Sequence, residues 1–174
     1  MSTPGRPKGE YRSAQHEGTP VNPATLDHAG IAARIPHSGR MCLLDRLLSW
    51  TPSEIICSAT SHTAADHPLR STDGLLAPVA IEYASQAMAL HGTLSAAPGS
   101  VPTPGYLAAV RGVHLHVPRL DTVPGPLRIS ATRLAGDAGQ ALYAFALHAE
   151  TGAPLVDGRA TVILNALPSA RTTT

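Results

Sequence analysis

The chain of 174 residues has few cysteines and almost no net charge. Cys42 and Cys57 are its two cysteines; they lack the close spacing of metal ligands, and one pair does not make a disulfide framework. This usage favours a reducing cytoplasm. Thirteen basic and twelve acidic residues leave a formal charge of +1, so the composition gives no sign of binding to nucleic acid or to a membrane surface.

Several familiar sequence signals are also missing. No apolar N-terminal run resembles a signal peptide, and no apolar segment has the length of a membrane span. Ser85 is not surrounded by a G-x-S-x-G motif, which argues against a serine nucleophile. No glycine-rich phosphate loop is present, so nucleotide binding is disfavoured.

What the sequence does contain is one long helical segment, from Pro78 to Ala97. It has no internal proline and consists mostly of alanine and other good helix formers. Pro78 suits a first helical turn, and the Ala-Pro-Gly run after residue 96 supplies a stop. Small residues recur around most of its circumference, which indicates a helix that other elements approach closely and enclose.

The remaining segments predict one α+β domain, an antiparallel sheet wrapped around this single long helix. Residues 1–30 are expected to be a flexible tail, residues 31–167 the domain, and residues 168–174 a second flexible tail. Consecutive strands with short turns between them favour antiparallel pairing, and one helix must then cover one face of the sheet. After an apolar region at residues 41–50, the expected strands are Glu54–His62, Tyr106–Val117, Leu127–Leu134, Ala141–His148 and Leu155–Leu164.

Glu82 is the one acidic residue of the helical segment. An acid in a first turn gains only about 0.3–1 kcal/mol from the helix dipole. Burying an unpaired carboxylate costs several kcal/mol. On an enclosed helix Glu82 therefore needs a functional reason, whereas on an exposed face it would be an ordinary polar residue.

Several histidines are candidates beside it. His67 lies in the loop that leads to the helix, where an imidazole can exchange protons with substrate, although a loop histidine before a proline is often a plain surface residue. His114 and His116 share one face of a strand and form a weak candidate pair for zinc. His91 points along the apolar side of the helix and is expected to be a satisfied core residue.

Two motifs resemble the 3-hydroxyacyl-ACP dehydratases of fatty-acid synthesis. The segment IPHSGRMCLLDR, with Pro36-His37 and Leu43 to Arg46, is similar to the P-H-x5-L-x-D-R opening of that family. The segment from Val79 to Ala87 is similar to the start of its central helix. The resemblance covers roughly residues 31–167 and is greatest to the divergent branch associated with aryl-polyene pigment clusters.

The resemblance implies a hotdog fold and a dimer whose catalytic pair is a loop histidine and a helix glutamate. By it, Glu82 is the acid and His67 the base, although the glycines of the family's H-F-P-G loop are absent around His67. Gln86 would orient Glu82, while Tyr83 and Met88 would line the acyl tunnel. His37, in the opening motif, is interpreted as a structural tie for the N-terminal turn.

The resemblance further implies a substrate carried on the phosphopantetheine of acyl carrier protein, with no metal or redox cofactor. The expected partners are that carrier and a second hotdog subunit, identical or different, with no nucleic acid and no membrane. The predicted function is dehydration of 3-hydroxyacyl-ACP to trans-2-enoyl-ACP in fatty-acid-like or aryl-polyene synthesis. Two alternatives stay open: a non-catalytic subunit that pairs with an active dehydratase, and an acyl-thioesterase.

Overall fold

The computed structural model describes residues 25–96, 105–137 and 139–164 of the chain. Along these residues helices, strands and short 3-10 turns follow one another. In chain order they are α1 (His28–Ala32), a 3-10 turn (Gly39–Met41), β1 (Arg46–Trp50), β2 (Glu54–Ala59), two 3-10 turns (Ser61–Thr63 and Ala77–Val79), α2 (Ala80–Leu94), β3 (Tyr106–Leu115), β4 (Leu127–Gly136), β5 (Gln140–His148) and β6 (Pro154–Ile163).

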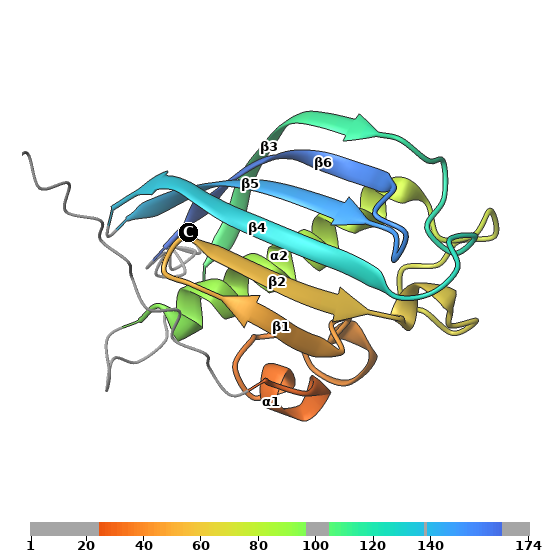
Figure 1. Ribbon diagram of the computed structural model, residues 1–174, viewed down its shortest axis with the longest axis horizontal. Coiled ribbons are helices and arrows are strands. Elements are labelled where there is room, and N and C mark those ends of the chain that lie inside the picture. The colour runs from red at the N-terminus through yellow and green to blue at the C-terminus, as the bar shows by residue number, and fades with distance from the viewer. Residues whose placement is uncertain (1–24, 97–104, 138, 165–174) are drawn as a thin grey trace, which may run out of the picture.

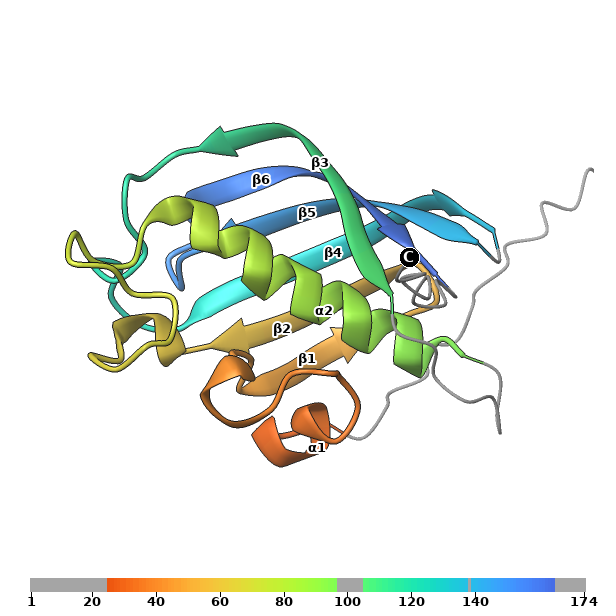
Figure 2. The same ribbon diagram turned by 180° about the vertical axis from the view of Figure 1, so that it is seen from behind.

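The strands form one antiparallel sheet in the order β1-β2-β4-β5-β6-β3. The sheet curves around α2, which lies across its concave side (Figure 1, Figure 2). Alternate strand residues face the helix, as the period of a strand requires: Ala141, Tyr143, Phe145 and Leu147 of β5 are buried, and the residues between them are half-buried. The predicted α+β arrangement, a sheet wrapped around one long helix, is confirmed.

Small side chains allow the sheet to approach α2. Ala80, Ala84 and Ala87 are fully buried, and the helix contacts β2, β4 and β5. The helix is shorter than predicted, because Pro78 belongs to the preceding 3-10 turn and the last helical residue is Leu94. A proline has no N–H to donate, so it fits this first turn without loss of a helical hydrogen bond.

The flexible tail predicted for residues 1–30 extends too far along the chain, because its last residues belong to the folded domain. α1 begins at His28, and Asp27 caps it by accepting a hydrogen bond from the N–H of Gly30 at 2.8 Å. Nδ1 of His28 donates to the carbonyl oxygen of Leu44 at 2.9 Å, which ties the segment to the domain. Residues 1–24 and the tail predicted at residues 168–174 lie outside the described residues.

His91 is fully buried with both ring nitrogens bonded, as expected of a satisfied core residue. Its Nε2 donates to the carbonyl oxygen of Thr51 at 2.9 Å, so its Nδ1 accepts from the hydroxyl of Tyr143 at 2.9 Å. The predicted pair does not share a strand face, because β3 ends at Leu115 and His116 lies just beyond it; both His114 and His116 contact the carboxylate of Asp157, at 2.9 and 2.6 Å.

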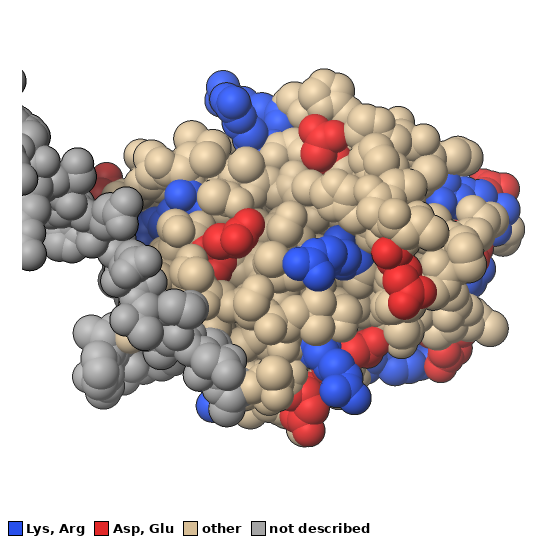
Figure 3. Space-filling view, viewed as in Figure 1, with Lys and Arg blue, Asp and Glu red and all other residues tan. Residues whose placement is uncertain are grey.

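On the convex side of the sheet, basic and acidic side chains are interspersed and neither sign gathers into a patch (Figure 3). This distribution agrees with the small formal charge of the whole chain. Among the described residues, no helix is both long enough and apolar enough to cross a membrane.

Candidate functional site

Glu82 lies in the first turn of α2, and its side chain is 28% exposed. Its two carboxyl oxygens have different surroundings. Oε1 lies 2.8 Å from Nε2 of Gln86 and 3.1 Å from Nε2 of His37. Among the residues that the structure describes, Oε2 has only a weak contact with Oγ of Ser85, at 3.5 Å, and that hydroxyl also donates to the carbonyl oxygen of Glu82 at 2.9 Å. Glu82 therefore has one bonded oxygen and one open oxygen.

Gln86 is fully buried one turn further along α2. The backbone N–H of Leu43 donates to its Oε1 at 2.8 Å, which fixes the orientation of the amide. Its Nε2 then donates to the carbonyl oxygen of Met41 and to Oε1 of Glu82, both at 2.8 Å. The structure thus places Gln86 against Glu82, in contact with the segment that carries the opening motif.

His37 is the histidine that lies against Glu82, a contact that the sequence interpretation missed. Its side chain is 26% exposed, and its Nδ1 is buried without a hydrogen-bond partner in the described part of the chain. Forty-five positions separate the two residues, so spacing along the chain could not reveal the contact. The available signal was that His37 and Glu82 belong to the two motifs that carry the family resemblance.

His67 is buried in the loop before α2, and both of its ring nitrogens are engaged inside the protein. The backbone N–H of Leu69 donates to Nδ1 at 3.1 Å, so Nε2 carries the hydrogen and donates to the hydroxyl of Tyr83 at 3.2 Å. That hydroxyl donates in turn to Oγ of Ser61 at 2.8 Å, which donates to the carbonyl oxygen of Leu43 at 2.9 Å. In this series of hydrogen bonds, from His67 through Tyr83 and Ser61 to Leu43, each donated hydrogen has an acceptor.

Burial keeps the His67 ring neutral. It lowers the pKa of His67 below its ordinary value of 6.5, and the positive charge of Arg70 lowers it further. Burial also raises the pKa of the Tyr83 hydroxyl to about 12. A neutral imidazole suits a general base, but its remaining lone pair, on Nδ1, is occupied by the N–H of Leu69.

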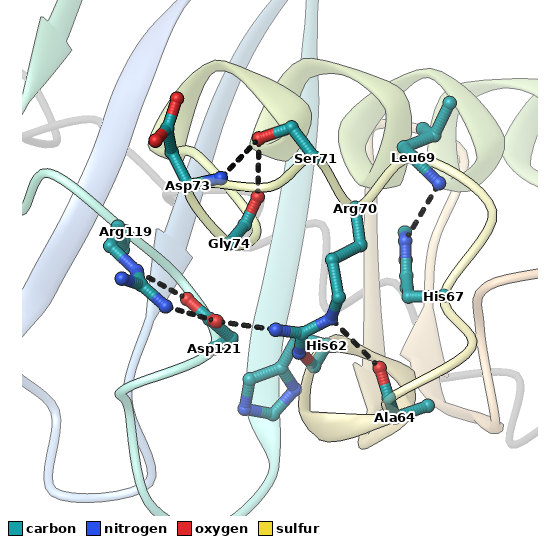
Figure 4. A network of polar contacts seen from close by, with 10 residues as sticks. All are labelled: His62, Ala64, His67, Leu69, Arg70, Ser71, Asp73, Gly74, Arg119 and Asp121. Carbon is teal, nitrogen blue, oxygen red and sulfur yellow. Dashed lines mark hydrogen bonds and ion pairs between the residues drawn. The ribbon is translucent and has the colours of Figure 1, made fainter.

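A salt-bridge network holds the loop that carries His67 (Figure 4). Asp121 accepts from Arg119 at 2.9 and 2.6 Å and from Arg70 at 2.7 Å, and Arg70 also donates to the carbonyl oxygen of Ala64. Arg119 and then Arg70 hold the pKa of the Asp121 carboxyl well below its usual range. Gly74 has a φ of +100°, and a Cβ there would collide with the Arg119 guanidinium, so this turn requires glycine.

A cavity of about 440 Å³ lies between the opening motif and the loop that carries His67. The N-terminal segment supplies one part of its lining, including Arg40 and Cys42, and the loop supplies another, including Ser61 and His67. Tyr83 and Met88 are buried in the core and are not among the lining residues. Their assignment to an acyl tunnel, and the catalytic roles of His67 and Glu82, stay predictions.

The described residues contain no group of three or more His, Cys, Asp or Glu side chains placed to hold a metal ion. Two separate pairs of groups are available for chemistry. One is the partly exposed carboxyl of Glu82 with the His37 imidazole, and the other is the buried His67 imidazole with the hydroxyl of Tyr83. Such groups transfer protons. A carboxyl and an imidazole can each accept and donate a proton at a positioned substrate.

Comparison with known proteins identifies the family and the fold. The family model described as ApeP dehydratase matches residues 29–171. Among curated proteins none matches the chain. Of the solved structures, the dehydratase heterocomplex ApeI:P from Xenorhabdus doucetiae superposes with a TM-score of 0.69 at 22% identity, over 78% of this chain and 91% of that one.

Two thioesterases are also similar in structure. One from Haemophilus influenzae has a TM-score of 0.52 at 15% identity, over 72% of this chain and 80% of its own. One from Pseudomonas aeruginosa has a TM-score of 0.52 at 14% identity, over 68% and 79%. At these identities the likeness shows the fold alone, which is the hotdog fold.

Proposed function

The chain belongs to the ApeP-like family of dehydratases, and from this premise we propose that it takes part in the dehydration of 3-hydroxyacyl thioesters carried on acyl carrier protein. In that reaction a base removes a proton from the α-carbon, and the electron pair of the C–H bond forms the new double bond. The β-carbon–oxygen bond breaks, and an acid protonates the departing hydroxyl to give water. The products are the trans-2-enoyl thioester and one water molecule.

The observation that carries this proposal is the unequal environment of the two oxygens of Glu82. Gln86 and His37 hold Oε1, whereas Oε2 is open on a carboxyl that is 28% exposed. A carboxyl fixed in this way can present its second oxygen to the β-hydroxyl of a bound substrate. In this proposal Glu82 is the acid, and its place in the first turn of α2 adds the positive end of a helix dipole.

The base of the reaction requires a free imidazole lone pair. His67 is our candidate from the family resemblance, and it can act only after Nδ1 releases the N–H of Leu69. Burial, which lowers the pKa of His67, supports a neutral ring but does not free a nitrogen. A rearrangement of the loop is therefore part of this version of the mechanism.

The engaged nitrogens of His67 favour a second candidate function: a subunit that completes its site by pairing with another hotdog subunit. In this version Glu82 acts with a histidine of the partner. The exposed edge strand β3 supports it, because the large apolar side chains of Tyr106, Leu107 and Leu115 are 39–50% exposed there. The ApeI:P structure is by its description a heterocomplex, and we infer a comparable pairing for this chain.

Intact-protein mass spectrometry tests both versions. A 3-hydroxyacyl carrier protein is incubated with the full chain alone, and then with the chain together with a second hotdog dehydratase subunit. Loss of one water with the chain alone supports His67 as base; loss only with the pair supports the shared site. Glu82→Gln should abolish either loss. Release of free acid, leaving the carrier deacylated, would replace the proposal by a thioesterase function.

A further inference from the structure

We infer that His37 is a positioning residue for Glu82: with Gln86 it makes Oε1 a permanent acceptor, so that Oε2 is the oxygen that carries and donates the proton. This inference rests on the proposed function, in which Glu82 is the acid. It assigns His37 a role in the reaction in place of the purely structural role that its motif suggests.

The first step of the argument is the orientation of Gln86. Because a backbone N–H can only donate, the atom of Gln86 that receives the N–H of Leu43 is the amide oxygen. The amide nitrogen is then the atom that faces Glu82, and it donates to Oε1 at 2.8 Å. Oε1 therefore already accepts one hydrogen bond, because an amide nitrogen can donate but cannot accept.

The second step is the tautomer of His37. Nδ1 is buried with no acceptor in the described part of the chain, so a hydrogen on that atom would have no partner. A neutral ring satisfies itself best with the hydrogen on Nε2, where Oε1 of Glu82 lies at 3.1 Å. A protonated ring also has a hydrogen on Nε2. In both charge states His37 donates to Oε1.

The third step follows for Glu82. An oxygen that accepts from both Gln86 and His37 has no room for a proton of its own along those directions. In the described part of the chain, the one polar contact of Oε2 is Oγ of Ser85 at 3.5 Å, and this hydroxyl already donates to the carbonyl oxygen of Glu82. The acidic form of Glu82 consequently has its proton on Oε2, directed away from the two donors.

The tautomer of His37 is tested without any assay of activity. In the full chain labelled with ¹⁵N at histidine, the ring signals of His37 are assigned by their loss in His37→Gln. We expect the hydrogen on Nε2 and a bare Nδ1, or a ring protonated on both nitrogens. A neutral ring with its hydrogen on Nδ1 would overturn the inference. This readout stands even if the chain proves not to be a dehydratase.

The kinetic test uses two substitutions at one position in the preparation that dehydrates the carrier-bound substrate. His37→Phe removes the donor and should lower kcat about 10- to 100-fold with little change in KM, since a misplaced group costs rate rather than binding. His37→Gln supplies an amide N–H near the position of Nε2 and should restore most of kcat. His148→Gln, at the last residue of β5, is the matched control.

Two results of the kinetic test would contradict the positioning role. Full activity of His37→Phe would show that Glu82 needs no second donor. Equal loss in His37→Phe and His37→Gln, with both variants folded by circular dichroism, would show that the ring itself gains and loses a proton. If wild-type chain gives no dehydration alone or with a partner subunit, the proposed function fails, while the tautomer measurement still decides the inference.

Discussion

Nε2 of His67 lies 3.2 Å from the hydroxyl oxygen of Tyr83, and both side chains are buried. This contact joins the loop that precedes α2 to the enclosed face of the helix. The two rings are stacked, with centroids 6.1 Å apart. The loop histidine that the family resemblance assigns to catalysis is thus also part of the hydrogen-bonded interior of the protein.

Tyr83→Phe should lower the free energy of unfolding by about 1–3 kcal/mol, the usual cost of leaving a buried polar group without its partner. The substitution keeps the ring but leaves the N–H of His67 without an acceptor. Urea denaturation measures the change. The matched control is Tyr106→Phe on β3, whose side chain is 50% exposed and which should change stability by less than about 0.5 kcal/mol. Equal effects of the two substitutions would contradict a structural role for the hydroxyl of Tyr83.

Gln86→Leu should reduce both stability and dehydration. It removes the partners of the Leu43 N–H and the Met41 carbonyl, and it frees Oε1 of Glu82 from one donor. We expect a loss of about 2–4 kcal/mol in urea denaturation, for one buried and one partly buried backbone group left unpaired. Ser85→Ala, which removes only the 3.5 Å contact with Glu82, is the control and should leave turnover nearly unchanged. A larger effect at Ser85 than at Gln86 would contradict the assignment of Oε1 as the bonded oxygen.

The protein should lose stability below neutral pH because of its buried histidines. Burial lowers the pKa of His62, His67 and His91 from 6.5, so the unfolded chain binds these protons more readily than the folded one. Their contribution is complete above about pH 6.5 and declines as the pH falls from there through the lowered values, by at most about 1.4 kcal/mol per pH unit for each ring. Urea denaturation between about pH 8 and about pH 5 measures the slope.

His62→Gln isolates one of these rings. The amide can still donate to the carbonyl oxygen of Val123, the partner of Nε2 of His62 in the structure, but it does not titrate. The pH dependence of stability should therefore be shallower in this variant than in wild type. A stability that is flat over the whole range in wild type would show that the three rings are not held neutral by the fold.

Asp121→Asn should destabilise the loop before α2 much more than Asp66→Asn does. Asp121 binds two arginines with its side chain 5% exposed, whereas Asp66 forms a single pair with Arg40 in which both side chains are about 70% exposed. Comparison of the urea midpoints at neutral pH, together with proteolysis of the loop, measures the difference. Similar midpoints for the two variants would show that the network of Arg70, Arg119 and Asp121 is not what fixes the loop.

Leu107→Arg should weaken association through the edge strand β3 without unfolding the chain. Leu107 is 39% exposed, so a charge there costs the isolated chain little but would be buried in a pair of subunits. Light scattering coupled to size exclusion should give a lower mass for the variant than for wild type, alone or mixed with a partner subunit. Ser130→Arg, on the outward face of β4, is the control. An unchanged mass in Leu107→Arg would place the interface elsewhere.

The fold could be predicted from the sequence because its main signals are local. Alternation along Ala141 to His148 gave a strand, and the small residues around Ala84 indicated an enclosed helix. The order of the strands in the sheet depends on pairings between distant segments, which no local pattern reports. The tail predicted for residues 1–30 is wrong from Asp27 onward, although aspartate is a typical residue at a helix N-cap.

The candidate site could be predicted only in part, for the same reason. Gln86 and Glu82 are one helical turn apart, so their contact follows from the period of a helix. The contact of His37 with Glu82, and that of His67 with Tyr83, depend on how loops fold back onto α2. Residue types alone favoured the loop histidine, but burial and hydrogen bonding decide which imidazole nitrogens are available.

The enclosure of α2 by the sheet has a consequence for how long different parts of the site keep their amide hydrogens. We expect the backbone amides of a helix covered in this way to exchange with solvent mainly through global unfolding. His37 comes instead from an irregular segment between α1 and β1, whose amides can exchange through small local openings. Glu82 and Gln86 therefore belong to the segment with the slowest amide exchange. The imidazole of His37, which contacts Glu82, belongs to a segment that exchanges faster.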